Sequence, residues 1–371
     1  MIVRALPDFN QFAYNNAIRS SAPENDGLFY FNSGSSAITF FLSLFGKGKR
    51  VGIQVFTCST VLDSIIRAGD IPFFMETNSD FFTTTIDIVN QHIHDIDILI
   101  LSHICGIPNP DYPSIKKLCH MNKVTVLDDL CQTFHSAWGG HLLEELSDNY
   151  VYSFFYDKPI SATKGGALKV SKYFYEQAKI NYDNLPQETE KDGHRNLNRL
   201  YWMSRLLMPQ HYQRDFRTWC SWELYILGAY PKKWPISMLK ILVNPSISMR
   251  ISKLMKSSGS PDIIKRLSDV HIKYIQGCMK SYKNNNHILL DFCKHLGVNL
   301  PIYMNDKRIE CSIAKRAIMP QSVMSLLGNV KVELGLYNWE QLIDNTADYQ
   351  CKSILKDNTN VPVSSKWYRR D

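Results

Sequence analysis

Two kinds of apolar segment alternate along the first half of this chain, and this alternation constrains its fold more than any other feature. Strand-like runs occur at residues 51–55, 72–76 and 97–103. Segments with apolar side chains three or four positions apart lie between them, at 57–68 and 84–93. Strands and helices joined in this way by short connections predict βαβ units and a parallel or mostly parallel sheet.

The same alternation continues on both sides of these segments. Further strands are expected at 27–33, 123–128, 150–155 and 167–171, and further helices at 34–46 and 112–122. The strand-like runs are nearly continuous in apolar residues, as expected where helices cover both faces of a sheet. The sequence therefore predicts a large α/β domain over residues 1–174.

The second half of the chain has a different pattern. Residues 175–256 hold four of the seven tryptophans and show helical rather than strand-like spacing, so we expect a helical insertion there. The remaining residues, 257–371, predict a small α+β domain. Within it we expect a long helix inside 261–297, a strand at 299–304, a helix at 314–327 and a short strand at 330–334.

Composition indicates a soluble chain in a reducing compartment. Hydrophobic residues make up 44% and charged residues 21% of the sequence, which is ordinary for a globular protein. The nine cysteines are scattered without a CxxC pair, which favours reduced thiols over a disulfide framework or a metal site. The first residues lack the apolar core of a signal peptide, and no apolar run is long enough to cross a membrane. We therefore expect a cytoplasmic protein.

The net charge of +7 is concentrated in the insertion. Residues 175–256 contain 13 Lys/Arg and 7 Asp/Glu, a local balance of +6. This stretch suits a solvated basic face or an anionic partner. The mixture of aromatic and basic residues at 200–240 suits weak contact with the inner face of a membrane, a protein partner, or a cap over an active site equally well. No nucleic-acid partner is expected.

Two charged residues stand at strand ends in the predicted sheet. Asp129 follows the run at 123–128, and Lys158 follows the run at 150–155. In an open α/β sheet, side chains just beyond the strand ends point into the ligand crevice. A carboxylate and an amine placed there suit a cofactor with one basic nitrogen and one aldehyde, which describes pyridoxal phosphate (PLP). Because side chains alternate along a strand, only one of Asp128 and Asp129 can face the crevice.

Several polar residues stand near these two. Ser35 and Ser36 open the predicted helix at 34–46, where free backbone N–H groups can hold a phosphate, although serine is also a common helix cap. Gln132 and Ser153 follow or end the same two strands and are candidates to hydrogen-bond the cofactor. Each signal is weak alone, but together they predict one cofactor site in an α/β crevice.

The order and spacing of several short motifs resemble the DegT/DnrJ/EryC1/StrS family of sugar aminotransferases. The motifs are SGSSA at 33–37, AGDIPFF at 68–74, SHICG at 102–106, VLDDLCQ at 126–132, YSFFYDK at 152–158 and GGAL at 165–168. The resemblance implies PLP fold type I, the fold of aspartate aminotransferase, with a mostly parallel central sheet and a small C-terminal α+β domain.

The resemblance also assigns roles to individual residues. It implies that Lys158 is the Schiff-base lysine, that Asp129 pairs with the pyridine nitrogen, and that Gln132 contacts the ring hydroxyl. It implies that Ser153, with the backbone of Ser35 and Ser36, binds the phosphate. The family usually places an aromatic residue against the ring at the position of Cys58, and Phe56 is the candidate to replace it.

The function expected from this resemblance is amino transfer, with glutamate as the donor, onto a nucleotide-linked keto-sugar for surface polysaccharide synthesis. A homodimer is expected, because related enzymes form their active site at a dimer interface. Two alternatives stay open. One is a degenerate relative that serves as a non-catalytic scaffold or regulator. The other is a related PLP sugar dehydratase, against which Lys158 argues because such relatives carry histidine there.

Overall fold

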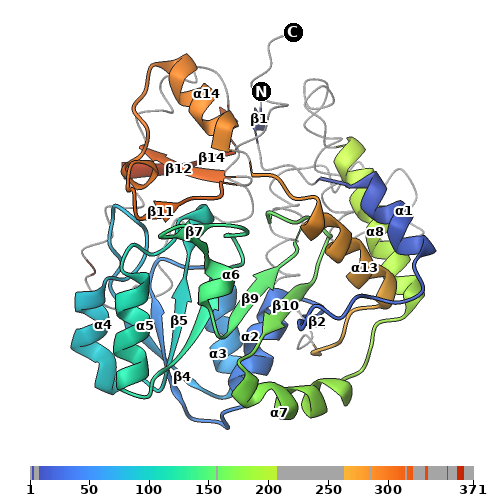
Figure 1. Ribbon diagram of the computed structural model, residues 1–371, viewed down its shortest axis with the longest axis horizontal. Helices are drawn as coiled ribbons and strands as arrows, with labels where there is room; N and C mark the ends of the chain where they lie inside the picture. The colour runs from blue at the N-terminus through green and yellow to red at the C-terminus, as the bar shows by residue number, and fades with distance from the viewer. Residues whose placement is uncertain are drawn as a thin grey trace, which may run out of the picture.

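The computed structural model describes most of the large domain and parts of the C-terminal region (Figure 1). The described residues are 2–3, 8–155, 158–206, 263–284, 286–313, 316–320, 331–332, 349 and 357–362. Most of the predicted insertion, including the basic and aromatic stretch at 207–240, lies outside them. The proposed division into domains at 174 and 256 therefore stays a prediction.

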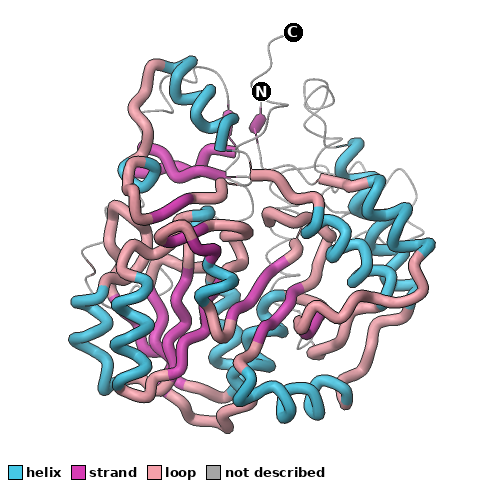
Figure 2. The backbone as a smooth tube through the Cα atoms, viewed as in Figure 1, coloured by secondary structure: helices cyan, strands magenta, loops and turns pink. Residues whose placement is uncertain are grey.

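A seven-stranded sheet forms the centre of the molecule (Figure 2). In spatial order its strands are β2 (Phe29–Phe31), β10 (Gly166–Lys169), β9 (Tyr150–Ser153), β6 (Thr125–Asp129), β5 (Ile98–Ser102), β3 (Arg50–Gln54) and β4 (Ile71–Met75). The five strands from β9 to β4 are parallel to one another. β10 runs antiparallel to both β9 and β2. The predicted mostly parallel sheet is confirmed.

Helices cover both faces of this sheet, which explains why its strands are apolar throughout. On β5, Ile98 and Ile100 pack into one buried cluster, whereas Leu99 and Leu101 pack into another on the opposite face. The first cluster includes side chains of α2 (Gly34–Ser43), α3 (Ser59–Ala68) and α7 (Lys172–Asp183). The second includes side chains of α4 (Ile86–His92) and α5 (Tyr112–Met121).

Three helices from distant parts of the sequence pack together beside this second cluster. They are α1 (Gln11–Arg19), α8 (Glu190–Leu206) and α13 (Asp269–Lys280), seen at the right of Figure 1. The contact between α1 and α13 is close, because a Cβ added at Gly277 would lie 2.9 Å from the Cβ of Ala13. The glycine therefore lets α13 bring the C-terminal half of the chain against the N-terminal helix.

A third apolar cluster joins the C-terminal region to the carboxyl edge of the sheet. It contains side chains of α14 (Asn286–Leu296), β11 (Ile309–Glu310) and β12 (Arg316–Pro320). Gly106 is required at this contact. Its φ is 86°, and a Cβ added there would lie 2.3 Å from the Ser312 carbonyl oxygen, so a residue with a side chain would not fit. The C-terminal region thus docks directly on the loop that follows β5.

The remaining short elements surround this contact. β11 pairs with β7 (Ala137–Trp138), which pairs with β8 (His141–Leu142), and α6 (Leu143–Leu146) follows. β12 pairs antiparallel with β14 (Asn358–Pro362), and β1 (Ile2–Val3) pairs parallel with β13 (Lys331–Val332). Short 3-10 turns occur at η1 (Ile93–Asp95), η2 (Ile104–Gly106) and η3 (Ile302–Met304).

Three predictions for the C-terminal region were wrong. The helix expected inside 261–297 is two helices, α13 and α14, separated by a turn near Ser281. The strand expected at 299–304 is the 3-10 turn η3 after Pro301. The helix expected at 314–327 gives way to the strand β12 at its start. In that last case the hydrogen bonds to β14, about forty residues later in the chain, outweigh the local helical spacing.

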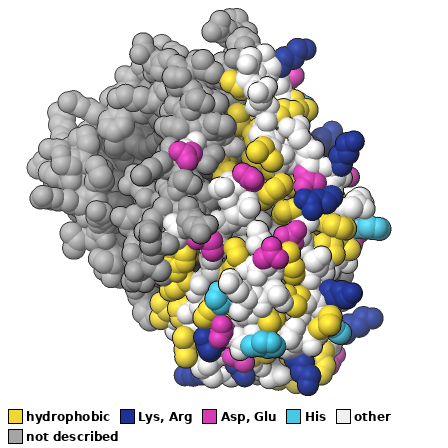
Figure 3. Space-filling model, turned by 90° about the vertical axis from the view of Figure 1, so that its left-hand side faces the viewer, with side chains coloured by type: hydrophobic (Ala, Val, Ile, Leu, Met, Phe, Trp, Pro, Cys, Tyr) yellow, Lys and Arg dark blue, Asp and Glu magenta, His cyan; other side chains and the backbone are white. Residues whose placement is uncertain are grey.

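On the face of the molecule in Figure 3, acidic, basic and hydrophobic side chains of the described residues are interspersed. They do not gather there into a patch of one charge sign. Among the described residues, no helix combines the length and the apolar character that crossing a membrane requires.

Candidate active site

A pocket opens at the carboxyl edge of the central sheet, where the parallel strands β3, β5, β6 and β9 end beside the start of α2. It encloses about 470 Å³ of space, including its solvent-open mouth. Its walls are formed by Gly34, Ser35, Ile38, Thr57, Cys58, Thr60, Val61, His103, Ile104, Asp129, Cys131, Gln132, Ser153 and Lys158. This is the place at which α/β sheets generally bind ligands.

Most of the residues predicted from the sequence meet in this pocket. Six of the eight candidates line it, namely Ser35, Cys58, Asp129, Gln132, Ser153 and Lys158. The other two, Ser36 and Phe56, do not. The assignment of chemical roles to the six stays a prediction, but the geometry brings together the carboxylate, the amine and the hydroxyl groups on which it depends.

The choice between the two acids at the end of β6 is visible in the structure. Asp129 lines the pocket and is 8% exposed. One of its oxygens, Oδ1, accepts a hydrogen bond of 3.0 Å from the backbone N–H of Cys131. Asp128 is completely buried on the other face of the strand, where its oxygens contact Tyr112, Lys116 and His103. The pocket carboxylate is therefore Asp129.

Lys158 stands on the loop between β9 and β10, and its side chain is almost entirely buried. Backbone hydrogen bonds shape this loop: the Lys158 N–H donates to Phe155 O at 3.0 Å, and the Ala162 N–H donates to Phe154 O at 2.8 Å. From outside the loop, the imidazole Nε2 of His271 contacts Ala162 O at 2.7 Å. Hydrogen bonds at Lys158 and at Ala162 thus hold the loop that carries the lysine.

Asp129 and Lys158 both act electrostatically on the Cys131 thiol, which lines the same pocket. Burial raises the pKa of the Cys131 thiol, the Asp129 carboxylate raises it further, and the Lys158 ammonium opposes them. The thiol is consequently neutral at physiological pH. The Asp129 carboxylate and the Lys158 ammonium thus act on the same small side chain, and both residues line the same pocket.

The start of α2 lies at one end of the pocket and has backbone N–H groups that suit an anion. The Ser33 side chain accepts the N–H of Ser36 at 3.0 Å and its carbonyl accepts the N–H of Ala37 at 3.2 Å. The earlier N–H groups, from Gly34 and Ser35, belong to residues that line the pocket. Ser36, although in the first turn, is thus held by the Ser33 cap, whose hydroxyl accepts the Ser36 N–H and donates to the Ser36 hydroxyl, and it does not line the pocket.

Two glycines allow the strands to approach this helix start closely. A Cβ added at Gly34 would lie 3.0 Å from the Cβ of Ser153, and one added at Gly166 would lie 2.5 Å from the carbonyl oxygen of Ser33. The Ser153 hydroxyl therefore lies next to the first turn of α2. A hydroxyl, backbone N–H groups and a positive helix end together suit a phosphate.

Gln132 lines the pocket from the loop after β6. Its Oε1 accepts a hydrogen bond of 2.9 Å from the backbone N–H of Cys105, a residue held at a positive φ of 53°. Because the oxygen is engaged, a ligand would meet the amide nitrogen as a donor. A donor suits the ring hydroxyl that was predicted as its partner.

Among the described residues that line the pocket, none carries a benzene or indole ring. Cys58, at the position where the family usually has an aromatic residue, does line the pocket, and its Sγ lies 3.1 Å from the Thr60 hydroxyl. Phe56 instead belongs to the apolar cluster under the C-terminal region, with its ring 6.0 Å from that of Phe82. Phe56 therefore does not take the place of the missing aromatic.

Sequence reasoning missed several residues of the pocket, above all His103. It follows β5, and its backbone N–H donates to Asp129 O at 3.3 Å. The rule that selected Asp129 and Lys158, polar groups just beyond parallel strand ends, also selects His103 in the motif SHICG. Thr57 and Cys131 could have been found in the same way after β3 and β6.

The donor set fits PLP. A carboxylate, an amine, a helix start with an adjacent hydroxyl, and an amide donor surround one pocket, which matches the ring nitrogen, aldehyde, phosphate and ring hydroxyl of that cofactor. A mostly parallel seven-stranded sheet with this site at its carboxyl edge is the architecture of PLP fold type I enzymes.

Comparison with known proteins agrees with this class. Residues 28–179 match the DegT/DnrJ/EryC1/StrS aminotransferase family. The resemblance predicted from the motifs is confirmed over this stretch, which contains every residue of the pocket.

Two curated relatives each match about two fifths of the chain. A GDP-perosamine synthase of Vibrio cholerae is 24% identical over 140 residues, 37% of this chain and 38% of that protein. A GDP-perosamine synthase of Escherichia coli O157:H7 is 22% identical over 160 residues, 43% of this chain and 42% of that protein. The chain thus spans about two fifths of the length of the curated relatives it matches.

Solved structures resemble a larger share of the chain. The Spr1654 protein of Streptococcus pneumoniae, described as a sugar aminotransferase and solved in its PLP-form, gives a TM-score of 0.62 at 12% identity over 98% of this chain and 94% of that chain. The aminotransferase TlmJ of Streptoalloteichus hindustanus gives 0.62 at 13% identity over 98% and 93%. The predicted fold class, PLP fold type I, is confirmed.

Proposed function

We propose that this protein is a PLP-dependent aminotransferase that moves an amino group, with glutamate as donor, onto a keto group of a nucleotide-linked sugar. The observation that carries the proposal is the meeting of Asp129 and Lys158 in one pocket with the anion site at the start of α2. The family match and the names of the curated relatives support the sugar substrate. Synthesis of a surface polysaccharide or a related glycan is the process such a product serves.

Each pocket residue has a defined task in this proposal. When bound, PLP supplies an aldehyde that condenses with amines and a ring that withdraws electrons from the substrate carbon. Lys158 would hold the aldehyde, and its Nζ, once free as an amine, would carry the proton between the substrate carbon and the cofactor carbon. The Asp129 carboxylate holds a proton at the ring nitrogen. Ser153 and the N–H groups of Gly34 and Ser35 bind the phosphate, and Gln132 donates to the ring hydroxyl.

Cofactor attachment tests this proposal directly. The purified protein should absorb in the yellow region when mixed with PLP, and borohydride should remove the band and leave a mass tag on Lys158. Lys158→Ala should lose the tag and transamination of nucleotide keto-sugars with glutamate. Lys172→Ala, which changes an exposed lysine at the start of α7, is the matched control and should keep both. Full transamination in Lys158→Ala would reject the assignment.

A second candidate function is a non-catalytic scaffold that retains the fold. The specific observation in its favour is that Cys58 lines the pocket where relatives have an aromatic residue, while Phe56 packs elsewhere. Under this alternative the protein would bind PLP weakly and would not turn over any of the keto-sugars. Cys58→Phe should then raise cofactor affinity without creating activity, whereas an active enzyme turns over substrate before any change at Cys58.

We further propose a cytoplasmic homodimer. The seven cysteines of the described residues are all free thiols, which supports a reducing compartment. Light scattering on the purified protein tests the dimer, for which a monomer mass at micromolar concentration would be the contrary result. Weak contact with the membrane surface through residues 200–240 is a separate proposal, and liposome flotation at low salt tests it.

A further inference from the structure

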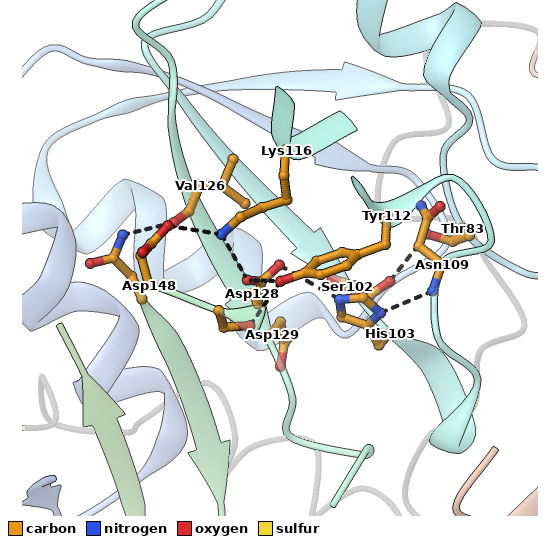
Figure 4. A network of polar contacts seen from close by, with 12 residues as sticks. Thr83, Ser102, His103, Asn109, Tyr112, Lys116, Val126, Asp128, Asp129 and Asp148 are labelled. Atoms are coloured by element: carbon orange, nitrogen blue, oxygen red, sulfur yellow. Dashed lines mark hydrogen bonds and ion pairs between the residues drawn. The ribbon is translucent and has the colours of Figure 1, made fainter. Parts of the chain in front are cut away.

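The buried acid behind the pocket, Asp128, is the centre of a network that the proposed chemistry does not use (Figure 4). Its Oδ2 accepts a hydrogen bond of 2.9 Å from the Tyr112 hydroxyl and lies 3.5 Å from Lys116 Nζ. Its Oδ1 lies 3.6 Å from the Nε2 of His103. Burial alone would raise the pKa of this carboxyl, but His103 and Lys116 outweigh burial and lower it, so Asp128 carries a negative charge.

His103 connects this charge to the pocket. The imidazole is 1% exposed and forms part of the pocket wall, while its Nε2 points toward Asp128. Its other nitrogen, Nδ1, accepts a hydrogen bond of 3.1 Å from the backbone N–H of Asn109. A nitrogen that accepts from an N–H cannot itself carry a proton, so the ring proton is on Nε2 and the ring is neutral.

A rigid loop maintains this arrangement. The side-chain nitrogen of Asn109 donates to the Thr83 hydroxyl at 3.0 Å, and both residues are labelled in Figure 4. The same nitrogen donates to the Thr84 carbonyl at 2.8 Å. The backbone N–H of Asn109 is thereby fixed against Nδ1 of His103. Because Nδ1 is held by the Asn109 N–H and Nε2 faces Asp128 at 3.6 Å rather than the pocket, His103 cannot pass a proton from Asp128 to the pocket. What the pair can transmit is an electric field and a fixed ring orientation.

The charge balance of the network is negative. Lys116 lies between Asp128 and the exposed Asp148, at 3.5 and 3.4 Å from their oxygens, so one positive charge faces two negative ones. Asp148 is 74% exposed and well screened by water, whereas Asp128 and His103 are buried. A buried charge is screened much less than an exposed one, so its field extends into the pocket.

We propose that Asp128 is a positioning residue of the pocket, which acts through His103 and favours the protonated form of the linkage between Lys158 and the cofactor aldehyde. This inference rests on the proposed function and adds a residue that has no contact with the cofactor. A negative charge nearby stabilises a positive nitrogen, so Asp128 raises the pH at which that nitrogen loses its proton.

Other titratable groups face the network and the pocket and are alternative origins of such a pH effect. On the network side they are Lys116, Asp148, Tyr112 and Cys119, and burial raises the pKa values of the last two. On the pocket side they are Asp129, Cys58, Cys131 and Lys158. The buried thiols of Cys119 and Cys131 and the phenol add no charge between pH 6 and 9. Asp128 differs from Asp129 in being shielded from both solvent and ligand, so only its charge, and no contact, can reach the cofactor.

The test is a pH titration of the visible absorbance of the holoprotein. In Asp128→Asn the midpoint should fall by about half to one pH unit relative to wild type, because the field is lost. Lys116→Met removes the opposing charge and should move the midpoint in the other direction. Asp148→Asn, at the exposed end of the same network, should leave the midpoint within about 0.2 units.

These variants separate a field effect from a loss of stability. A merely structural Asp128 would lower the melting temperature of Asp128→Asn and leave the midpoint unchanged, and that outcome overturns the inference. If Asp128→Asn does not fold, Lys116→Met decides, and an unchanged or lowered midpoint overturns it. Nitrogen NMR of His103 in wild type adds a check without cofactor, because a proton on Nδ1 would contradict the arrangement.

The inference can fail without the proposed function. A wild-type protein that never turns yellow with PLP refutes the proposed function. A yellow wild type whose midpoint is the same as those of Asp128→Asn and Lys116→Met refutes only the role of Asp128.

Discussion

Strand β6 ends in two aspartates that face opposite sides of the strand and have different surroundings. Asp128 and Asp129 are neighbours, both are carboxylates, and both are nearly inaccessible to water. Asp128 is surrounded by Tyr112, Lys116 and His103 within 3.6 Å. For Asp129, the hydrogen bond from the Cys131 N–H leaves acceptor capacity directed at the pocket.

This difference separates a charge that the fold itself satisfies from one that is left for a ligand. A buried carboxylate is expensive unless protein groups satisfy it, and Asp128 meets that condition within the fold. Asp129 meets it only in part, so a ligand with a positive or donating group has an energetic reason to bind there. Substitutions on the two faces should therefore have their largest effects on different quantities, on activity at the pocket face and on stability at the buried face.

The largest expected effect is on the pocket face. Asp129→Asn keeps the size of the side chain and an oxygen for the Cys131 N–H, but it removes the charge that, in the proposed function, holds a proton on the cofactor ring nitrogen. Transamination should fall by at least about a hundredfold, the scale of losing one electrostatic contact to the reacting group. Steady-state kinetics with glutamate measure this. If Asp129→Asn melts normally and keeps activity within tenfold of wild type, the pocket face does not carry the functional charge that this comparison assigns to it.

On the buried face, Asp128→Ala should act mainly on stability. It leaves the Lys116 ammonium without its buried counter-charge and the Tyr112 hydroxyl with only its Ser147 contact, and breaking a buried pair in this way costs about 3–5 kcal/mol. Chemical denaturation measures the loss. Asp148→Ala removes the exposed partner of the same lysine and should cost no more than about 1 kcal/mol. Equal losses in the two variants would show that burial does not distinguish the two acids.

Much of the large domain could be predicted because its signals are local. The strands from β3 to β6 are short apolar runs separated by helical spacing, and parallel strand ends always meet at one edge of a sheet. These two facts were enough to bring Asp129, Lys158, Ser153 and Ser35 together from the sequence alone. The alternation of side chains also showed that one of the two acids must face away.

What could not be predicted depends on contacts between distant residues. β12 is a strand only because β14, about forty residues later, supplies its hydrogen bonds, and local spacing carries no trace of that partner. Phe56 is two residues from Cys58, yet it packs under the C-terminal region because Phe82 and other distant side chains form a cluster there. The tautomer of His103 likewise depends on the loop at Asn109, which the sequence does not reveal as a partner.

His271 extends the comparison to the loop that carries Lys158. Burial lowers its pKa to about 4, with a small opposing effect from the Ala162 carbonyl. The unfolded chain binds a proton near pH 6.5 but the folded one does not until about 4, so stability falls as the pH drops through this window. At pH 5 the loss relative to pH 7 should be about 2 kcal/mol.

The matched variant for this prediction is His271→Gln, which keeps a donor for Ala162 O and does not titrate. Its stability should change less than that of wild type between pH 7 and pH 5, as measured by denaturation at both values. A parallel decline in wild type and variant would mean that other groups cause the acid sensitivity, and that the histidine behind the lysine loop is not a buried neutral donor.

The smallest expected effect concerns the Tyr112 hydroxyl of the Asp128 network. Tyr112→Phe keeps the buried ring but removes a hydroxyl that donates to Asp128 Oδ2 and also lies 2.9 Å from the Ser147 hydroxyl; the bond to the charged acceptor should contribute ~1.5 kcal/mol. Tyr282→Phe is the control for a neutral partner, because the Tyr282 hydroxyl lies 3.0 Å from the Ser312 hydroxyl, and this contact should contribute less. A loss for Tyr112 of more than about twice the loss for Tyr282 supports a charged Asp128, because Tyr112 loses two contacts and only an ionised acceptor strengthens one of them. Equal losses would indicate a protonated, neutral Asp128, and the contrast between the two faces of β6 would then rest on position rather than on charge.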